Sequence, residues 1–139
     1  MATVLVIDDE RLIRWSIEQT LCAAGHVVSV AASAAEGLAL FRRCPPEVVL
    51  LDLRLPDEDG LTVLGRIVSE GAGQTAVIVM TAFSETYSAA DILNLGARDY
   101  LKKPFDFDAL ETIVGRALER GRLEREVPAL RAGPKDTGS

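Results

Sequence analysis

This chain of 139 residues contains five short apolar runs, which are separated by longer amphipathic segments. The runs are rich in Val, Ile and Leu and lack strict apolar–polar alternation, which is typical of strands buried on both faces of a sheet. The predicted strands are TVLVI (3–7), HVVSV (26–30), EVVLL (47–51), AVIVM (76–80) and DYLKK (99–103). Strands that alternate with helices need right-handed crossovers, so the pattern predicts a parallel α/β sheet with helices on both faces.

Residues that start and stop helices mark the segments between the runs. Gly25 is placed as a glycine at a helix C-terminus, and Ser33 with Glu36 forms a capping-box pattern. Asp106, just after a proline, is a candidate N-cap for the last helix. The predicted helices cover 10–24, 33–43, 60–70, 85–95 and 106–126.

Composition indicates one soluble domain. We expect it to span residues 1–126, with 127–139 as a linker or disordered tail, because that stretch is rich in Pro, Gly and polar residues. The formal net charge of −6 disfavours direct binding to nucleic acid by this segment. No apolar run approaches the roughly 20 residues of a membrane span, and no secretory signal is evident. Two cysteines without CxxC spacing favour a cytoplasmic location over a disulfide framework, and we expect both to be packing residues.

Polar residues stand at the ends of four predicted strands. Asp8 and Asp9 follow the first strand, Asp52 the third and Thr81 the fourth, while Lys103 ends the fifth. The carboxyl ends of parallel strands point to one edge of a sheet, where ligands bind. Any one of these residues alone reads as a cap, a turn or a solvated side chain. Their joint occurrence predicts a single site.

The chemistry of such a cluster favours a divalent cation. Two carboxylates about 4 Å apart repel by roughly 4 kcal/mol at an effective dielectric constant near 20. Without compensation one of them would take up a proton, and all-oxygen ligation suits Mg²⁺ better than zinc. A magnesium ion held this way often completes its shell with phosphate oxygens. Asp52 is therefore a candidate acceptor of a phosphoryl group, with Lys103 and Thr81 as neutralising partners.

The motifs VLVIDDE, VVLLDLRLPDEDGL, VIVMTAF and GARDYLKKPFD, in this order, resemble the receiver domains of two-component response regulators. IRWSIEQTL, DLRLPDEDGL and DYLKKPFDFDAL are most similar to the NtrC-type subgroup, in which the receiver precedes an ATPase module and a DNA-binding module. The resemblance implies a flavodoxin-like, doubly wound, five-stranded parallel sheet in the order 2-1-3-4-5 with five helices.

The resemblance also implies roles for the polar residues at the strand ends. Asp52 would accept a phosphoryl group from a sensor histidine kinase. Asp9 and Asp52 would bind Mg²⁺ directly together with the backbone carbonyl of Arg54, and Asp8 would act mainly through water. Lys103 would pair with Asp52 and with the phosphoryl oxygens.

Three further features of the switch follow from the same resemblance. Thr81 would hydrogen-bond a phosphoryl oxygen, and Tyr100 would change rotamer as Thr81 moves. Alternation along the strand and adjacency to proline favour Lys103 over its neighbour Lys102 as the pocket lysine. The Lys103–Pro104 peptide bond is expected to be cis.

Two surfaces are candidates for partner binding. Ile13, Ile17, Leu21 and Ala24 share one face of the first helix and should be core. Trp15 lies on another side, where it either packs over a neighbouring loop or anchors the kinase. In the last helix, one apolar seam is followed by a second with heptad-like spacing that could form a homodimer through the fifth-helix region. The first seam is Leu110, Val114, Ala117 and Gly121, and the second is Leu123, Val127 and Leu130.

Three alternatives to a phosphorylation switch stay open at the level of sequence. A magnesium-dependent phosphatase or phosphotransferase of the haloacid-dehalogenase type would usually carry a DxD motif, whereas Asp8 and Asp9 are adjacent. A flavin-binding electron carrier is disfavoured because DDE after the first strand would repel the cofactor phosphate. A receiver-like interaction module that works unphosphorylated is disfavoured by the complete set of pocket residues.

Overall fold

A computed structural model describes residues 2–71, 73–82 and 88–126 of the chain. The five strands form one parallel sheet in the order β2-β1-β3-β4-β5, which confirms the predicted doubly wound α/β fold. The strands are β1 (Thr3–Ile7), β2 (Val27–Ala31), β3 (Val48–Asp52), β4 (Ala76–Thr81) and β5 (Asp99–Lys102). The helices are α1 (Arg11–Ala23), α2 (Ala34–Arg43), α3 (Gly60–Gly71), α4 (Ala89–Asn94) and α5 (Phe107–Glu126).

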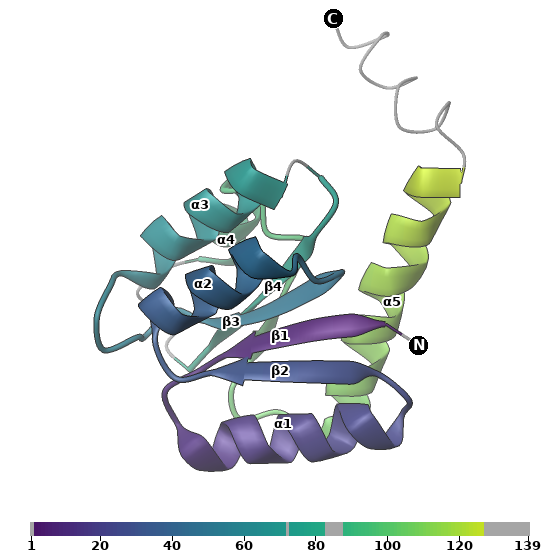
Figure 1. Cartoon of the computed structure of the whole chain (residues 1–139), viewed down its shortest axis with the longest axis horizontal. Coiled ribbons are helices and arrows are strands. Elements are labelled where there is room, and N and C mark those ends of the chain that lie inside the picture. The colour runs from purple at the N-terminus through teal and green to yellow at the C-terminus, as the bar shows by residue number, and fades with distance from the viewer. Residues whose placement is uncertain (1, 72, 83–87, 127–139) are drawn as a thin grey trace, which may run out of the picture.

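The helices cover both faces of the sheet (Figure 1). On one face α2, α3 and α4 contribute Phe41, Leu64 and Ile92 to a buried apolar cluster with the strands. On the other face α1 and α5 contribute Leu21 and Leu110 to a second cluster. Strands β3 and β4 lie between both clusters, and every one of their residues is buried. This explains why their sequences are continuous apolar runs.

Local sequence signals place most helix ends. Ser33 accepts a hydrogen bond from the Glu36 amide at 3.2 Å, and Asp106 accepts one from the Ala109 amide at 2.7 Å, so both predicted caps are confirmed. Gly25 has a φ of 95°, and the amide of the following residue, His26, donates to the Leu21 carbonyl at 3.0 Å. This is the Schellman arrangement that a glycine permits after a helix.

Several element boundaries differ from the prediction, including three that concern the site or the helix beside it. Asp52 and Thr81 are the last residues of their strands, not the residues that follow them. Helix α4 begins at Ala89, capped by Ser88, and residues 85–87 of the predicted helix lie outside the described part of the chain. The shift toward Ser88 is physically favourable because its side chain accepts a hydrogen bond from the Asp91 amide at 3.1 Å.

Three of the predicted core positions are wrong. Ala24, Cys22 and Cys44 are exposed, and both cysteines are free thiols. Ala24 is the C-cap that follows the last helical residue of α1, so the helical periodicity no longer applies to it. Ile17 and Leu21 are fully buried as predicted.

The first apolar seam of the last helix is core. Leu110, Val114 and Ala117 are buried against the sheet, which leaves them no surface for a second copy of the chain. Of the second seam, Leu123 lies within α5, while Val127 and Leu130 fall outside the described residues. Among the described helices, none has the length and apolar character needed to cross a membrane.

The tight approach of α3 to the end of β3 predicts opposite effects for two glycine substitutions in one helix. A Cβ atom at Gly60 would lie 2.3 Å from the Leu53 Cα atom, whereas nothing lies within 4 Å of a Cβ at Gly65. Gly60→Ala should therefore destabilise the fold by about 2 kcal/mol or more. Gly65→Ala should stabilise it by about 0.5–1 kcal/mol, because alanine restricts the unfolded chain and favours helix.

Urea denaturation of the two variants and the wild type measures both effects. A Gly60→Ala variant as stable as the wild type would contradict the close approach of α3 to Leu53.

Candidate functional site

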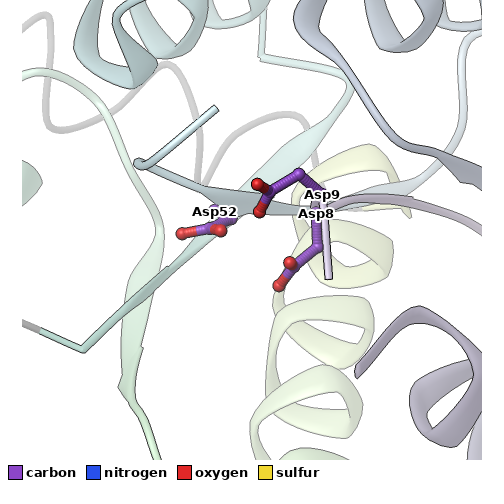
Figure 2. A group of neighbouring side chains, drawn as sticks. All are labelled: Asp8, Asp9 and Asp52. Atoms are coloured by element: carbon purple, nitrogen blue, oxygen red, sulfur yellow. The ribbon is translucent and has the colours of Figure 1, made fainter. Parts of the chain in front are cut away.

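Three carboxylates gather at the carboxyl ends of two neighbouring strands (Figure 2). Asp8 and Asp9 follow β1, and Asp52 ends β3, and one oxygen from each lies within 4.8 Å of the others. Asp8 is fully buried and Asp52 is 4% exposed, while Asp9 is open to solvent. The pairing of β1 with β3 brings these acids together although more than forty residues separate them in sequence.

Lys103 provides the positive charge inside this cluster. Its Nζ atom lies 2.7 Å from Asp8 Oδ2, 3.3 Å from Glu10 Oε1 and 3.6 Å from Asp52 Oδ2. The main chain places it there, because the Lys103 amide donates to the Thr81 carbonyl at 2.7 Å. Lys103 thus ties the end of β5 to the acids of β1 and β3.

Asp8 is held from several sides. Its Oδ1 atom accepts a hydrogen bond from the Glu10 amide at 2.9 Å, and its carbonyl accepts one from Arg14 Nη1 at 2.8 Å. The Asp8 amide donates to the Ala31 carbonyl of β2 at 3.1 Å. Glu10 and Arg14 were not among the residues predicted for the site. The run DDE signals Glu10 as a third acid beside the pocket, but nothing local shows that Arg14 reaches back to the end of β1.

Burial and charge perturb the titration of the site. Burial, followed by the neighbouring charge of Asp8, raises the pKa of Asp52 from 3.8 to about 6, and the Arg54 amide and Lys103 only partly oppose this. Burial lowers the pKa of the Lys103 ammonium, but the hydrogen bond to Asp8 and the charge of Asp52 outweigh it and raise that pKa overall. Lys103, predicted as a neutralising partner of Asp52, therefore does not fully compensate the neighbouring acids by itself.

A cavity of about 520 Å³ opens beside the acids, lined by Asp9, Glu10, Asp52, Arg54, Leu55, Pro56, Ala82 and Lys103. The Arg54 amide donates to Asp52 Oδ1 at 3.1 Å, which fixes the main chain of Arg54 at the rim of the cavity. Three carboxylates, two of them buried and one open to solvent, form beside this cavity the hard oxygen donor set that Mg²⁺ prefers. The residues present therefore fit this cation.

The remaining predicted residues lie around this cavity at different depths. Thr81 is buried at the end of β4, and its neighbour Ala82 lines the cavity. Tyr100 is half-buried on the α4 side of β5, packed against the same apolar cluster as Ile92. Lys102 is exposed, and the Lys103–Pro104 peptide bond is cis.

An apolar surface borders the same pocket on the α1 side. Trp15 is 58% exposed and Leu12 is 71% exposed. A groove of about 480 Å³ runs between α1 and the segment after β5, and Trp15 is not among the residues that line it. Leu12, Ile13, Phe105 and Phe107 line it, together with the pocket residues Glu10 and Lys103.

Comparisons with known proteins agree on one family. The family model described as "Response regulator receiver domain" matches residues 4–115. The regulatory protein AtoC of Escherichia coli K12 is 37% identical over 124 residues, covering 89% of this chain and 27% of AtoC. The DNA-binding transcriptional regulator NtrC of the same organism is 39% identical over 123 residues, covering 88% of this chain and 26% of NtrC.

The fold is similar to that of a solved relative. A crystal structure of NtrX from Brucella abortus superposes with a TM-score of 0.86 and 34% sequence identity, covering 94% of this chain and 30% of that one. The chain therefore spans about a quarter of the length of the regulators AtoC and NtrC and resembles one part of each.

The raised pKa of Asp52 predicts how stability depends on pH without a divalent cation. The folded state holds the Asp52 proton more tightly than the unfolded state, so the stability gained from this group is complete below pH 4 and is lost as the pH rises through 6. Asp52→Asn removes the loss. The free energy of unfolding of this variant minus that of the wild type should be about 1–2 kcal/mol larger at pH 8 than at pH 4.

Urea denaturation in the presence of a chelator, at both pH values, measures the difference. Adding Mg²⁺ should stabilise the wild type more at pH 8 than at pH 5. A difference between the two proteins that does not change with pH would contradict the raised pKa.

Proposed function

The chain belongs to the response regulator receiver domains, and on this premise we propose that Asp52 accepts a phosphoryl group from a phosphohistidine of a sensor kinase. The observation that carries the proposal is the position of Asp52, buried among Asp8, Asp9 and Lys103 and bordering an open cavity. A carboxylate buried next to other carboxylates lowers the stability of the fold. Its presence in the pocket is therefore better explained by a functional role than by a structural one.

The reaction needs little from the protein beyond positioning and charge. The Asp52 carboxylate attacks phosphorus, a P–O bond forms, the P–N bond to the imidazole breaks, and the imidazole leaves with the bonding electron pair. The Arg54 amide holds Oδ1 at 3.1 Å, which orients the carboxylate and directs Oδ2 toward Lys103. The Lys103 ammonium lies within reach of the phosphoryl oxygens that gain charge during transfer.

A magnesium ion would be held by Asp9, Asp52 and the Arg54 carbonyl, with Asp8 acting through water. When bound, it would neutralise charge on the phosphoryl oxygens and lower the pKa of Asp52. Asp8 suits an indirect role because its Oδ2 atom already accepts the short hydrogen bond from Lys103 at 2.7 Å. Asp9 suits a direct role because it is exposed and lines the cavity.

The output of the reaction would be a shift between two surface conformations. Thr81 would move toward the phosphoryl group, and Tyr100 would change rotamer in response. The two residues stand on neighbouring strands, with Tyr100 paired to Val79 two positions before Thr81. The change would then act on the face formed by α4 and β5, and the exposed leucines Leu93 and Leu95 of this region support such a surface.

The whole regulator would act in the cytoplasm through an ATPase module and a DNA-binding module, as an NtrC-type transcriptional activator. The family match favours this signalling role over a phosphatase that turns over external phosphoesters. Homodimers would form through the part of α5 beyond Gly121, because the earlier seam of α5 is buried against the sheet. The net charge of −6 supports contact with protein partners and not with nucleic acid by this segment.

Labelling by a small phosphodonor tests the phosphoacceptor directly. With acetyl phosphate and Mg²⁺, the wild type should gain one phosphoryl group, visible by intact mass spectrometry, and Asp52→Asn should gain none. The exposed acid Asp108 in the first turn of α5 gives a matched control, and Asp108→Asn should be labelled like the wild type. Stoichiometric labelling of Asp52→Asn at another residue would overturn the assignment.

Trp15 is proposed as the anchor for the kinase. Trp15 is exposed on α1, the helix whose Leu12 and Ile13 line the apolar groove, and an exposed tryptophan is the kind of side chain that dominates interface energetics. Trp15→Ala should slow phosphotransfer from a sensor kinase about tenfold or more, while the rate with acetyl phosphate changes less than about twofold. Val27→Ala, at an exposed apolar residue of the edge strand β2, should leave both rates unchanged. Equal slowing of both reactions by Trp15→Ala would contradict a docking role.

A further inference from the structure

One carboxylate ties the loop between β3 and α3 to the start of α2. Asp57 Oδ1 accepts a hydrogen bond from the Ala34 amide at 2.9 Å, and Oδ2 accepts one from the Ala35 amide at 3.0 Å. These are the first two amides of α2, which have no acceptor within the helix. The helix dipole adds to the attraction for a negative charge at this end. Asp57 therefore connects two segments that are 22 residues or more apart in sequence.

The same loop carries the rim of the phosphoacceptor pocket. Arg54, three residues before Asp57, lines the cavity, and its amide donates to Asp52 Oδ1. The loop is closed at its base, where the Gly60 amide donates to the Leu53 carbonyl at 3.2 Å and Arg54 forms an antiparallel bridge with Asp59. Because the loop is short and closed, its residues are expected to move together. The hydrogen bonds that Asp57 makes at the loop tip therefore also limit the position of Arg54.

Helix α2 is itself firmly held, which makes it a suitable anchor. At its other end Arg42 donates from Nε and Nη2 to the two carboxylate oxygens of Glu70 in α3, both at 2.8 Å. Along its length Leu38 and Phe41 are buried in the apolar cluster on this face of the sheet. Helices α2 and α3 lie side by side over that face (Figure 1). Asp57 thus joins the pocket loop to a packed helix and not to another loop.

We propose that Asp57 is a positioning residue for the phosphoacceptor site: by binding the start of α2 it fixes the Arg54 main chain beside Asp52 and strengthens binding of the divalent cation. This inference rests on the proposed function for the cation site and adds a residue to it that does not touch the cation. The two backbone hydrogen bonds also lower the pKa of Asp57. The carboxylate therefore stays charged throughout the neutral range, and the connection persists wherever phosphotransfer takes place.

Coupling between Asp57 and the cation must act in both directions. If the connection to α2 raises cation affinity, then bound cation must stabilise the connection by the same free energy. Cation binding at the pocket should therefore stabilise the hydrogen bonds of Asp57 to the start of α2, which belongs to the helix layer on one face of the sheet.

Mg²⁺ titration by calorimetry on the full chain tests the affinity. Asp57→Ala should raise the Mg²⁺ dissociation constant about tenfold, the size of effect that supporting residues around a metal site commonly have. Asp57→Asn keeps the size and one acceptor oxygen, so its dissociation constant should lie between those of Asp57→Ala and the wild type. This second variant also serves if Asp57→Ala folds poorly.

Two matched controls separate positioning from charge and from stability. Glu58→Gln removes the same charge from the same loop, where Glu58 pairs with Arg66 at 3.0 Å, and it should bind Mg²⁺ within twofold of the wild type. Ser33→Ala removes the cap of α2 itself without touching the pocket loop. It should lower the melting temperature and leave Mg²⁺ affinity unchanged. If Asp57→Ala behaves like Ser33→Ala, Asp57 is merely a second helix cap and the proposal is overturned.

Amide hydrogen exchange by NMR tests the connection without any cation. In chelator, the Arg54 amide should exchange faster in Asp57→Ala than in the wild type or Glu58→Gln. With Mg²⁺, the Ala34 and Ala35 amides of the wild type should exchange more slowly. Unchanged Arg54 exchange in Asp57→Ala would overturn the positioning role. A wild type that binds no Mg²⁺ would instead overturn the proposed cation site, while the exchange measured in chelator still decides whether Asp57 holds the loop.

Discussion

The contact between Lys103 and the acids of β1 and β3 is the interaction on which the site depends. Its ammonium lies 2.7 Å from Asp8 and 3.6 Å from Asp52, and without it two buried carboxylates would face each other uncompensated. A buried charge that loses its partner costs several kcal/mol, so the sheet must hold the end of β5 where Lys103 reaches β1. The hydrogen bond from the Lys103 amide to the Thr81 carbonyl does this through the main chain. Site and sheet therefore constrain each other.

This one positive charge does not balance the pocket. Burial and the charge of Asp8 leave the pKa of Asp52 raised to about 6 even with Lys103 nearby. The remaining repulsion is what a divalent cation would relieve on binding, so part of its affinity would come from a free-energy penalty that the fold already carries. A pocket with a second lysine would be more stable, but it would gain less from the cation. The raised pKa is in this sense a property that suits a binding site better than a structural core.

The sequence predicted the elements that depend on local chemistry and on strand order. Continuous apolar runs, the caps at Ser33 and Asp106 and the glycine after α1 all act within a few residues, and the convergence of Asp9, Asp52 and Lys103 follows once the sheet is known to be parallel. The errors and omissions involve longer range. Cys22 and Cys44 were expected to be packing residues, but both are exposed, and each stands at or next to the end of a helix, where the side chain's surroundings depend on tertiary packing.

The contact of Asp57 with α2 shows why such omissions are unavoidable without coordinates. In LPDEDG this aspartate looks like an ordinary turn residue, and α2 already has its own cap in Ser33. The first two amides of α2 lack acceptors within the helix, but only the tertiary structure shows that the loop tip comes within 3.0 Å of them. The residues proposed to contact a phosphoryl group and its cation need particular chemistry and can be recognised from their type and position. The residues that position these contacting residues need only reach suitable backbone groups. Their role therefore depends on the tertiary structure and cannot be recognised from a sequence motif.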